Sequence, residues 1–156
     1  MGFRIEHRIG VQAPAEVIWN LIADLPGWSS WNPIYKDASG RIGIGEKLSM
    51  TLTLPGEVHR PLQPRVLDWE PNAQLVWRLD LMPWLAHTVR YLEIEVLSDA
   101  GCIFANGEFF HGAVGERVGR AKRRAIFQGF SQLGEAVKAI AERRWREDGG
   151  RATSPG

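Results

Sequence analysis

An arginine and a glutamate in two neighbouring strand-like segments have the spacing to act together. In TVRYLEIEV, residues 88–96, Arg90 shares one face with the apolar positions, and in CIFANGEFF, residues 102–110, Glu108 shares one face with Asn106 and two phenylalanines. If the segments pair through the turn between them, Arg90 and Glu108 become neighbours across the sheet, whereas a slip of one residue separates them. Such a pair could orient a carbonyl or phenol, or supply an acid and a base. It could also be a structural ion pair.

The histidines and the single cysteine offer little further chemistry. His7 alternates with apolar residues in FRIEHRIGV, residues 3–11. A histidine there is either a hydrogen-bonded core residue or, beside a cavity, a general base. The other histidines lie in or next to predicted turns without a partner at metal-ligand spacing, and nothing near Cys102 would activate its thiol. We therefore expect no metal and no cofactor.

Two tryptophans stand three residues apart in PGWSSWNP, residues 26–33. This spacing places Trp28 and Trp31 on one side of a short helical turn, which the following Asn-Pro pair ends. Either one of them, Trp31, caps the core, or both line a pocket for a flat or apolar ligand.

Composition places limits on the class of protein. The chain has 156 residues, with 19 Lys and Arg against 18 Asp and Glu, so its charge gives no reason to expect nucleic-acid binding. The first ten residues lack the apolar run of a secretory signal, and no segment has the length of a membrane span. We expect a cytoplasmic protein with one domain over residues 1–146 and a disordered tail over 147–156. A homodimer is left open.

Periodicity indicates an α+β protein. Residues 3–11 alternate like a half-buried strand, a helix follows from Pro14, and residues 35–110 read as strands and short turns. Apolar residues then recur every three or four positions from about 116 to 146, which predicts one long amphipathic helix. A single helix cannot fill the concave face of a bent sheet, so we expect a cavity between them.

Six short motifs occur in an order that is similar to a known family. They are V-x-A-P-x-E-V-I-W (11–19), W-x-x-W-N-P (28–33), G-x-x-x-x-G (40–45), P-x-V (64–66), E-F-F-x-G (108–112) and G-F-x-x-L followed by A-V-K-A-x-A-E (129–142). Their order resembles the polyketide cyclase/dehydrase-like branch of the START/Bet v 1-like superfamily, also called SRPBCC. The resemblance implies a helix-grip fold: a seven-stranded antiparallel sheet wrapped around the C-terminal helix, two short helices after the first strand, and a hydrophobic tunnel.

The first functional hypothesis is binding of a small hydrophobic molecule, aromatic or lipid-like, in that cavity. The predicted pocket residues are Trp31, Met50, Trp77, Arg90, Leu92, Glu108, Phe110, Phe130 and Leu133. The sequence does not name the ligand, nor does it say whether the cavity is open or filled by aromatic side chains.

Two alternatives remain. In a cyclase or dehydratase, Arg90, Glu108 or His7 would assist proton transfer, and whether the chain catalyses any reaction stays open. In a protein-interaction module, of the kind that activates a chaperone or partners a toxin, the basic C-terminal helix would bind an acidic partner, because residues 116–146 carry nine basic residues and three acids. A solvated outer helix face explains those charges equally well.

Overall fold

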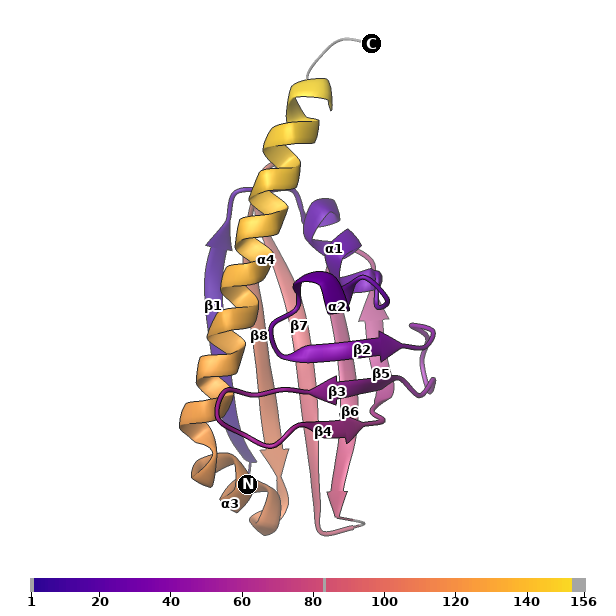
Figure 1. Ribbon diagram of the computed structural model, residues 1–156, viewed down its shortest axis with the longest axis vertical. Helices are drawn as coiled ribbons and strands as arrows, with labels where there is room; N and C mark the ends of the chain where they lie inside the picture. Colours follow the sequence, from indigo (N-terminus) through magenta and orange to yellow (C-terminus); the bar gives the residue numbers. More distant parts are fainter. Residues whose placement is uncertain (1, 83, 153–156) are drawn as a thin grey trace.

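The structure, a computed structural model, describes residues 2–82 and 84–152 as two antiparallel sheets and four helices (Figure 1). The larger sheet has the order β1-β8-β7-β6-β5. Its strands are β1 (Gly2–Val11), β5 (Arg65–Glu70), β6 (Gln74–Met82), β7 (Ala86–Ser98) and β8 (Gly101–His111). The smaller sheet contains β2 (Tyr35–Ser39), β3 (Ser49–Leu52) and β4 (Arg60–Leu62), and the helices are α1 (Ala15–Ala23), α2 (Trp28–Trp31), α3 (Gly112–Ala121) and α4 (Arg123–Ala152). The α+β helix-grip class is confirmed.

The strand arrangement differs from the single seven-stranded sheet that was expected. Eight strands occur in the described ranges, and three of them form a separate sheet that crosses the front of the larger one (Figure 1). The glycine-rich stretch after β2 is the physical reason. Gly40 and Gly45 both have positive φ, 123° and 84°, so the chain turns there between β2 and β3.

The predicted C-terminal helix is divided in two. It begins earlier than expected, at Gly112, where a φ of 82° turns the chain out of β8, and it breaks at Lys122 before α4 starts. The short α3 lies at one end of the larger sheet, and α4 runs along β1 and β8 (Figure 1). The predicted tail overlaps α4 as far as Ala152, and residues 153–156 lie outside the described residues.

The tryptophan pair is part of the core at the α1 end, where Trp28 is fully enclosed and Trp31 is half-buried at the edge. Trp31 packs against the edge of the core, as the capping interpretation expected, and Trp28 is the tryptophan inside it. The Trp28 indole Nε1 donates to the carbonyls of Leu21 and Ile22, both at 3.1 Å. These carbonyls belong to the last turn of α1 and have no partner within the helix, so Trp28 caps α1 as well as filling the core.

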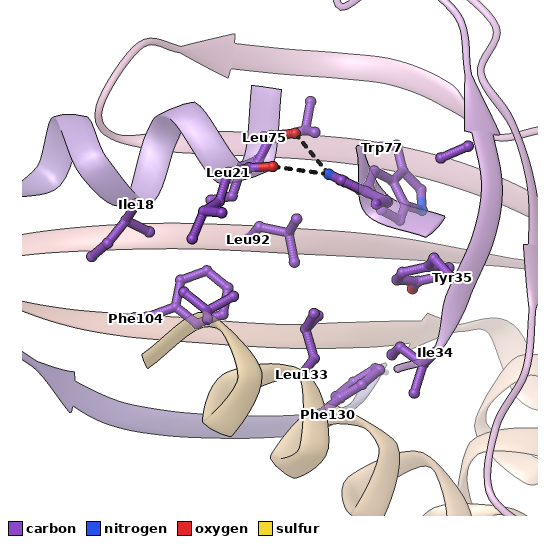
Figure 2. Packing of buried hydrophobic residues seen from close by; sticks show 14 of the residues in the cluster. Ile18, Leu21, Ile34, Tyr35, Leu75, Trp77, Leu92, Phe104, Phe130 and Leu133 are labelled. Atoms are coloured by element: carbon purple, nitrogen blue, oxygen red, sulfur yellow. Dashed lines mark hydrogen bonds between the residues drawn. The ribbon is translucent and has the colours of Figure 1, made fainter. Parts of the chain in front are cut away.

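The main core lies between the larger sheet and α4. Phe130 and Leu133 project from α4 toward Leu92 and Phe104 on the sheet, and α1 closes the far end with Ile18 (Figure 2). All five side chains are buried. Their burial fixes the position of α4 over the sheet, because interiors are packed as densely as organic crystals.

Candidate ligand-binding cavity

A cavity lies between the two sheets, next to the corner where α3 meets α4. Its walls are mainly apolar, with Trp77 and Leu79 from β6, Leu54 after β3, and Ile126 and Phe130 from α4. The centre of a water molecule can reach about 60 Å³, and about 710 Å³ is empty when the open mouth is counted. An apolar concavity with few polar groups is the usual form of a small-molecule site.

The predicted pocket residues divide into two groups. Four of them line the cavity, namely Trp77, Glu108, Phe110 and Phe130. The others do not: Met50, Arg90, Leu92 and Leu133 are buried behind the wall, and Trp31 lies at the edge of the core. None of these five residues is among those that line the cavity.

Arg90 is a fully buried cation held by neutral oxygens. Its Nε donates to the Tyr35 hydroxyl at 2.8 Å, its Nη1 to the carbonyls of Tyr91 and Gly107 at 3.0 and 3.1 Å, and its Nη2 to Asn106 Oδ1 at 3.0 Å. Its guanidinium also lies 3.8 Å from the centre of the Phe130 ring, a cation–π distance. Arg90 thus ties β2, β8 and α4 together behind the cavity.

The predicted pairing of Arg90 with Glu108 is confirmed in register, since the two residues are directly opposite on β7 and β8. No ion pair within 4.0 Å joins them in the described part of the chain. Arg90 donates its hydrogen bonds to Tyr35, Asn106 and two backbone carbonyls, whereas Glu108 is one of the residues that line the cavity. The structural ion pair that one hypothesis proposed is therefore absent from the described residues.

Tyr35 is the polar group that sequence reasoning missed. It lines the cavity and is buried, and burial raises the pKa of its hydroxyl although the Arg90 charge lowers it. The hydroxyl accepts from Arg90 and, within the described ranges, donates to no other group. Its proton therefore has no acceptor among the described residues. No local signal marks Tyr35, because its partner is 55 positions away in the sequence.

Glu108 and Thr88 form the second polar feature of the wall. Burial raises the pKa of the half-buried Glu108 carboxyl, and Arg90, the Thr88 hydroxyl and Arg60 lower it to a smaller extent. Thr88 Oγ1 is buried and has no hydrogen bond of good geometry to any described residue. Its position two residues before Arg90 on one strand face was a signal that sequence reasoning could have used.

His7, the third candidate for chemistry, lies away from the cavity. It packs under α4, where a Cβ added to Gly134 would lie 2.7 Å from its Nδ1, and its ring meets the edge of Phe127. Burial lowers the pKa of its imidazole. The described residues contain no group of three or more side chains suited to a metal ion.

The basic residues of the C-terminal helices lie on the surface, with Arg123 and Arg124 exposed at the start of α4. Their role in binding a protein partner stays a prediction. Within residues 2–82 and 84–152, no helix is both long and apolar enough to cross a membrane.

Comparisons with known proteins agree with this fold. The family model described as "Polyketide cyclase / dehydrase and lipid transport" matches residues 2–142. No curated protein matches the chain. Among solved structures, the Zhui aromatase/cyclase from Streptomyces sp. R1128 has 19% identity and a TM-score of 0.76, with 96% of this chain and 99% of that chain covered.

Two further structures show the same architecture. The di-domain aromatase/cyclase StfQ of the steffimycin biosynthetic pathway has 13% identity and a TM-score of 0.71, covering 92% of this chain and 52% of that one. A norcoclaurine synthase point mutant from Thalictrum flavum has 15% identity and a TM-score of 0.67, covering 92% and 96%. At these identities the likeness shows a shared fold and leaves function to be argued from the site.

Proposed function

Because this chain belongs to the polyketide cyclase/dehydrase and lipid transport family, we propose that its cavity binds a small, mainly apolar ligand that carries a carbonyl or phenol oxygen. One observation carries the proposal. The Tyr35 hydroxyl, with its proton unused, and the Glu108 carboxyl both line a cavity that is otherwise largely apolar. A few convergent polar groups in an apolar wall orient a ligand. Here the Tyr35 hydroxyl can donate to an oxygen, and burial, which raises the pKa of Glu108, favours the neutral carboxyl that would do the same.

The Arg90 charge strengthens this donor. A hydroxyl that accepts from a guanidinium becomes a better donor itself, since linked hydrogen bonds polarise one another. The aromatic walls supplied by Trp77 and Phe130 suit a flat ring. An aromatic ligand with a carbonyl or phenol oxygen satisfies both requirements, and a saturated hydrocarbon satisfies neither.

The binding test uses 2-naphthol and naphthalene, which share a ring system and differ by one hydroxyl. Quenching of tryptophan fluorescence, with Trp77 in the wall, reports binding of both probes. We expect 2-naphthol to bind about five- to tenfold more tightly, the effect of a net hydrogen bond of about 1 kcal/mol. Tyr35→Phe should remove most of that difference.

Tyr91→Phe is the matched control for this test. It deletes the same atom from a tyrosine that faces the other side of the sheet, where its hydroxyl donates to Glu6. The proposal is wrong if neither probe binds, or if Tyr91→Phe weakens 2-naphthol binding as much as Tyr35→Phe does.

A second function, cyclase or dehydratase chemistry, is favoured by the raised pKa of Glu108. A neutral carboxyl can give its proton to a departing hydroxyl, which leaves as water. The resulting carboxylate can then take a proton from the adjacent carbon, so that a double bond forms and Glu108 is restored. Tyr35 would hold the neighbouring carbonyl oxygen.

The test of this second function follows the absorbance of a β-hydroxy ketone as it loses water to form an enone. We expect Glu108→Gln to abolish the rate above buffer while 2-naphthol still binds, since an amide keeps the shape and cannot cycle a proton. A rate in Glu108→Gln equal to that of the wild-type protein would refute the role of this carboxyl, and no rate in the wild-type protein would refute the function.

A further inference from the structure

A surface groove adjoins the cavity where β5 ends. β5 and β6 pair only as far as Arg65 opposite Arg78, and β6 continues to Met82 without that neighbour. β4, paired with β3 on one side only, lines the opposite wall of the groove. The centre of a water molecule can reach about 710 Å³ in it. The groove is therefore an opening between the two sheets.

The charged side chains of this groove are mostly basic. Lys47, Arg60, Arg65 and Arg78 line it together with one carboxylate, Asp80. The chain as a whole has a net charge of only +1, so this excess is local. A surface concavity with one sign of charge concentrates ligands of the opposite sign.

Two of the four cations form neither a salt bridge nor a side-chain hydrogen bond within residues 2–82 and 84–152. Arg78 Nε pairs with Asp80 at 2.9 Å, and Arg65 Nη1 donates to the Gly45 carbonyl at 2.6 Å. Lys47 and Arg60 make no ion pair or side-chain hydrogen bond to the described residues. Their donors are available to an anion.

The groove and the cavity share part of their walls. Arg60, Leu62 and Leu79 line both, so the two spaces adjoin at these side chains. A molecule that passes between these side chains would place an apolar ring in the cavity and a polar extension in the groove. The opposite arrangement, a charged group inside and a ring outside, would desolvate the charge against the apolar wall.

We propose that the ligand is an organic anion, with its ring in the cavity and a phosphate or carboxylate group bound by Lys47 and Arg60 in the groove. This inference rests on the proposed function and extends it to the class of ligand. The groove supplies charge-assisted hydrogen bonds, which are stronger than neutral ones. It selects against cationic ligands of the same shape.

The test compares four probes on the full chain: 2-naphthol, 2-naphthyl phosphate, 2-naphthoate and inorganic phosphate. The proposal requires at least one of the two anionic ring probes to bind about tenfold more tightly than 2-naphthol at low salt, and this advantage should fall as salt rises. The better of the two identifies the group as phosphate or carboxylate. Millimolar inorganic phosphate should compete with 2-naphthyl phosphate and leave 2-naphthol binding unchanged.

Two charge-reversal variants, each of which changes the net charge by two units, distinguish an effect of the groove from an effect of the protein's overall charge. Lys47→Glu reverses a cation of the groove, and Arg144→Glu reverses an exposed cation of α4 outside both spaces. We expect Lys47→Glu to remove the advantage of the anionic probe, about tenfold, with 2-naphthol binding unchanged. At about 0.1 M salt, Arg144→Glu should change neither affinity by more than about twofold, because Arg144 lines neither space and salt screens exposed charges.

The inference is overturned on its own if wild-type protein binds 2-naphthol but binds both anionic ring probes no more tightly. It is also overturned if both charge reversals weaken the anionic probe equally. If no ring probe binds at all, the proposed function fails and the inference fails with it. Urea unfolding of each variant verifies that the exposed substitutions leave the fold intact.

Discussion

Removing the Tyr35 hydroxyl should destabilise the protein more than the loss of one ordinary hydrogen bond. Tyr35→Phe leaves Arg90 Nε–H without an acceptor, and both residues are buried. A buried donor on a charged group that loses its partner costs about 2–3 kcal/mol, because it cannot regain a water molecule easily. In a chain of 156 residues this corresponds to a fall in Tm of about 6–9 °C.

Tyr91→Phe provides the matched comparison on the other face of the sheet. Its hydroxyl donates to Glu6, whose side chain is 17% exposed and also lies near two arginines. Water can reach Glu6 after the substitution, so we expect a loss of about 1 kcal/mol or less. Urea unfolding followed by tryptophan fluorescence measures both variants, and an unchanged m-value shows that the unfolding transition is comparable.

A double-mutant cycle tests the assigned cause. If Tyr35→Phe acts through the guanidinium, its cost should shrink to below about 1 kcal/mol in an Arg90→Met background, where no donor is left unpaired. The reasoning would be refuted by an equal cost of Tyr35→Phe in both backgrounds. It would be refuted equally by losses of the same size from Tyr35→Phe and Tyr91→Phe.

Three further predictions follow from packing and charge. Gly107→Ala should lower the free energy of unfolding in urea by more than about 2 kcal/mol, because the added Cβ would lie 2.8 Å from a backbone carbonyl oxygen. Gly10→Ala, whose Cβ would have no atom within 4 Å, should lower it by less than about 1 kcal/mol. Equal losses from the two variants would contradict this prediction. Trp28→Phe should cost about 2–4 kcal/mol by emptying core volume and uncapping α1, and Trp31→Phe less than about 1 kcal/mol; the reverse order in urea unfolding would contradict the burial. The pKa of Glu108 is raised in the folded protein, so the stability that this carboxyl contributes is fully present below its unfolded pKa and is lost as the pH rises through its folded pKa. Glu108→Gln should therefore become progressively more stable than the wild-type protein as the pH rises above about 4.5. A difference in unfolding free energy that does not change with pH would refute the raised pKa.

Local patterns in the sequence predicted much of the scaffold. Alternation along β7 and β8 correctly predicted that Arg90 and Glu108 would be opposite one another, because side chains change face at every residue of a strand and a short turn limits the register. The apolar spacing of the C-terminal helix correctly placed Phe130 and Leu133 on its buried side. The ordered motifs indicated the family that the match over residues 2–142 then showed.

Features set by contacts between distant segments were missed or wrong. The break between α3 and α4 and the separation of β2, β3 and β4 from the larger sheet depend on contacts with distant parts of the chain, although the glycines after β2 marked the turn before β3. The choice of Trp28 over Trp31 for the core likewise depended on where α1 ends, since that end supplies the carbonyls that the Trp28 indole caps.

The sequence by itself determined that a buried arginine, a carboxyl and an apolar helix face would lie inside an α+β protein. Only the tertiary structure decided which polar residues line the cavity. Arg90 donates its hydrogen bonds to Tyr35, Asn106 and two carbonyls, and Tyr35 and Glu108 are among the residues that line the cavity. Hydrogen bonds between strands far apart in the chain have no local periodicity, so their partners become defined only when the sheets and α4 close around the same space.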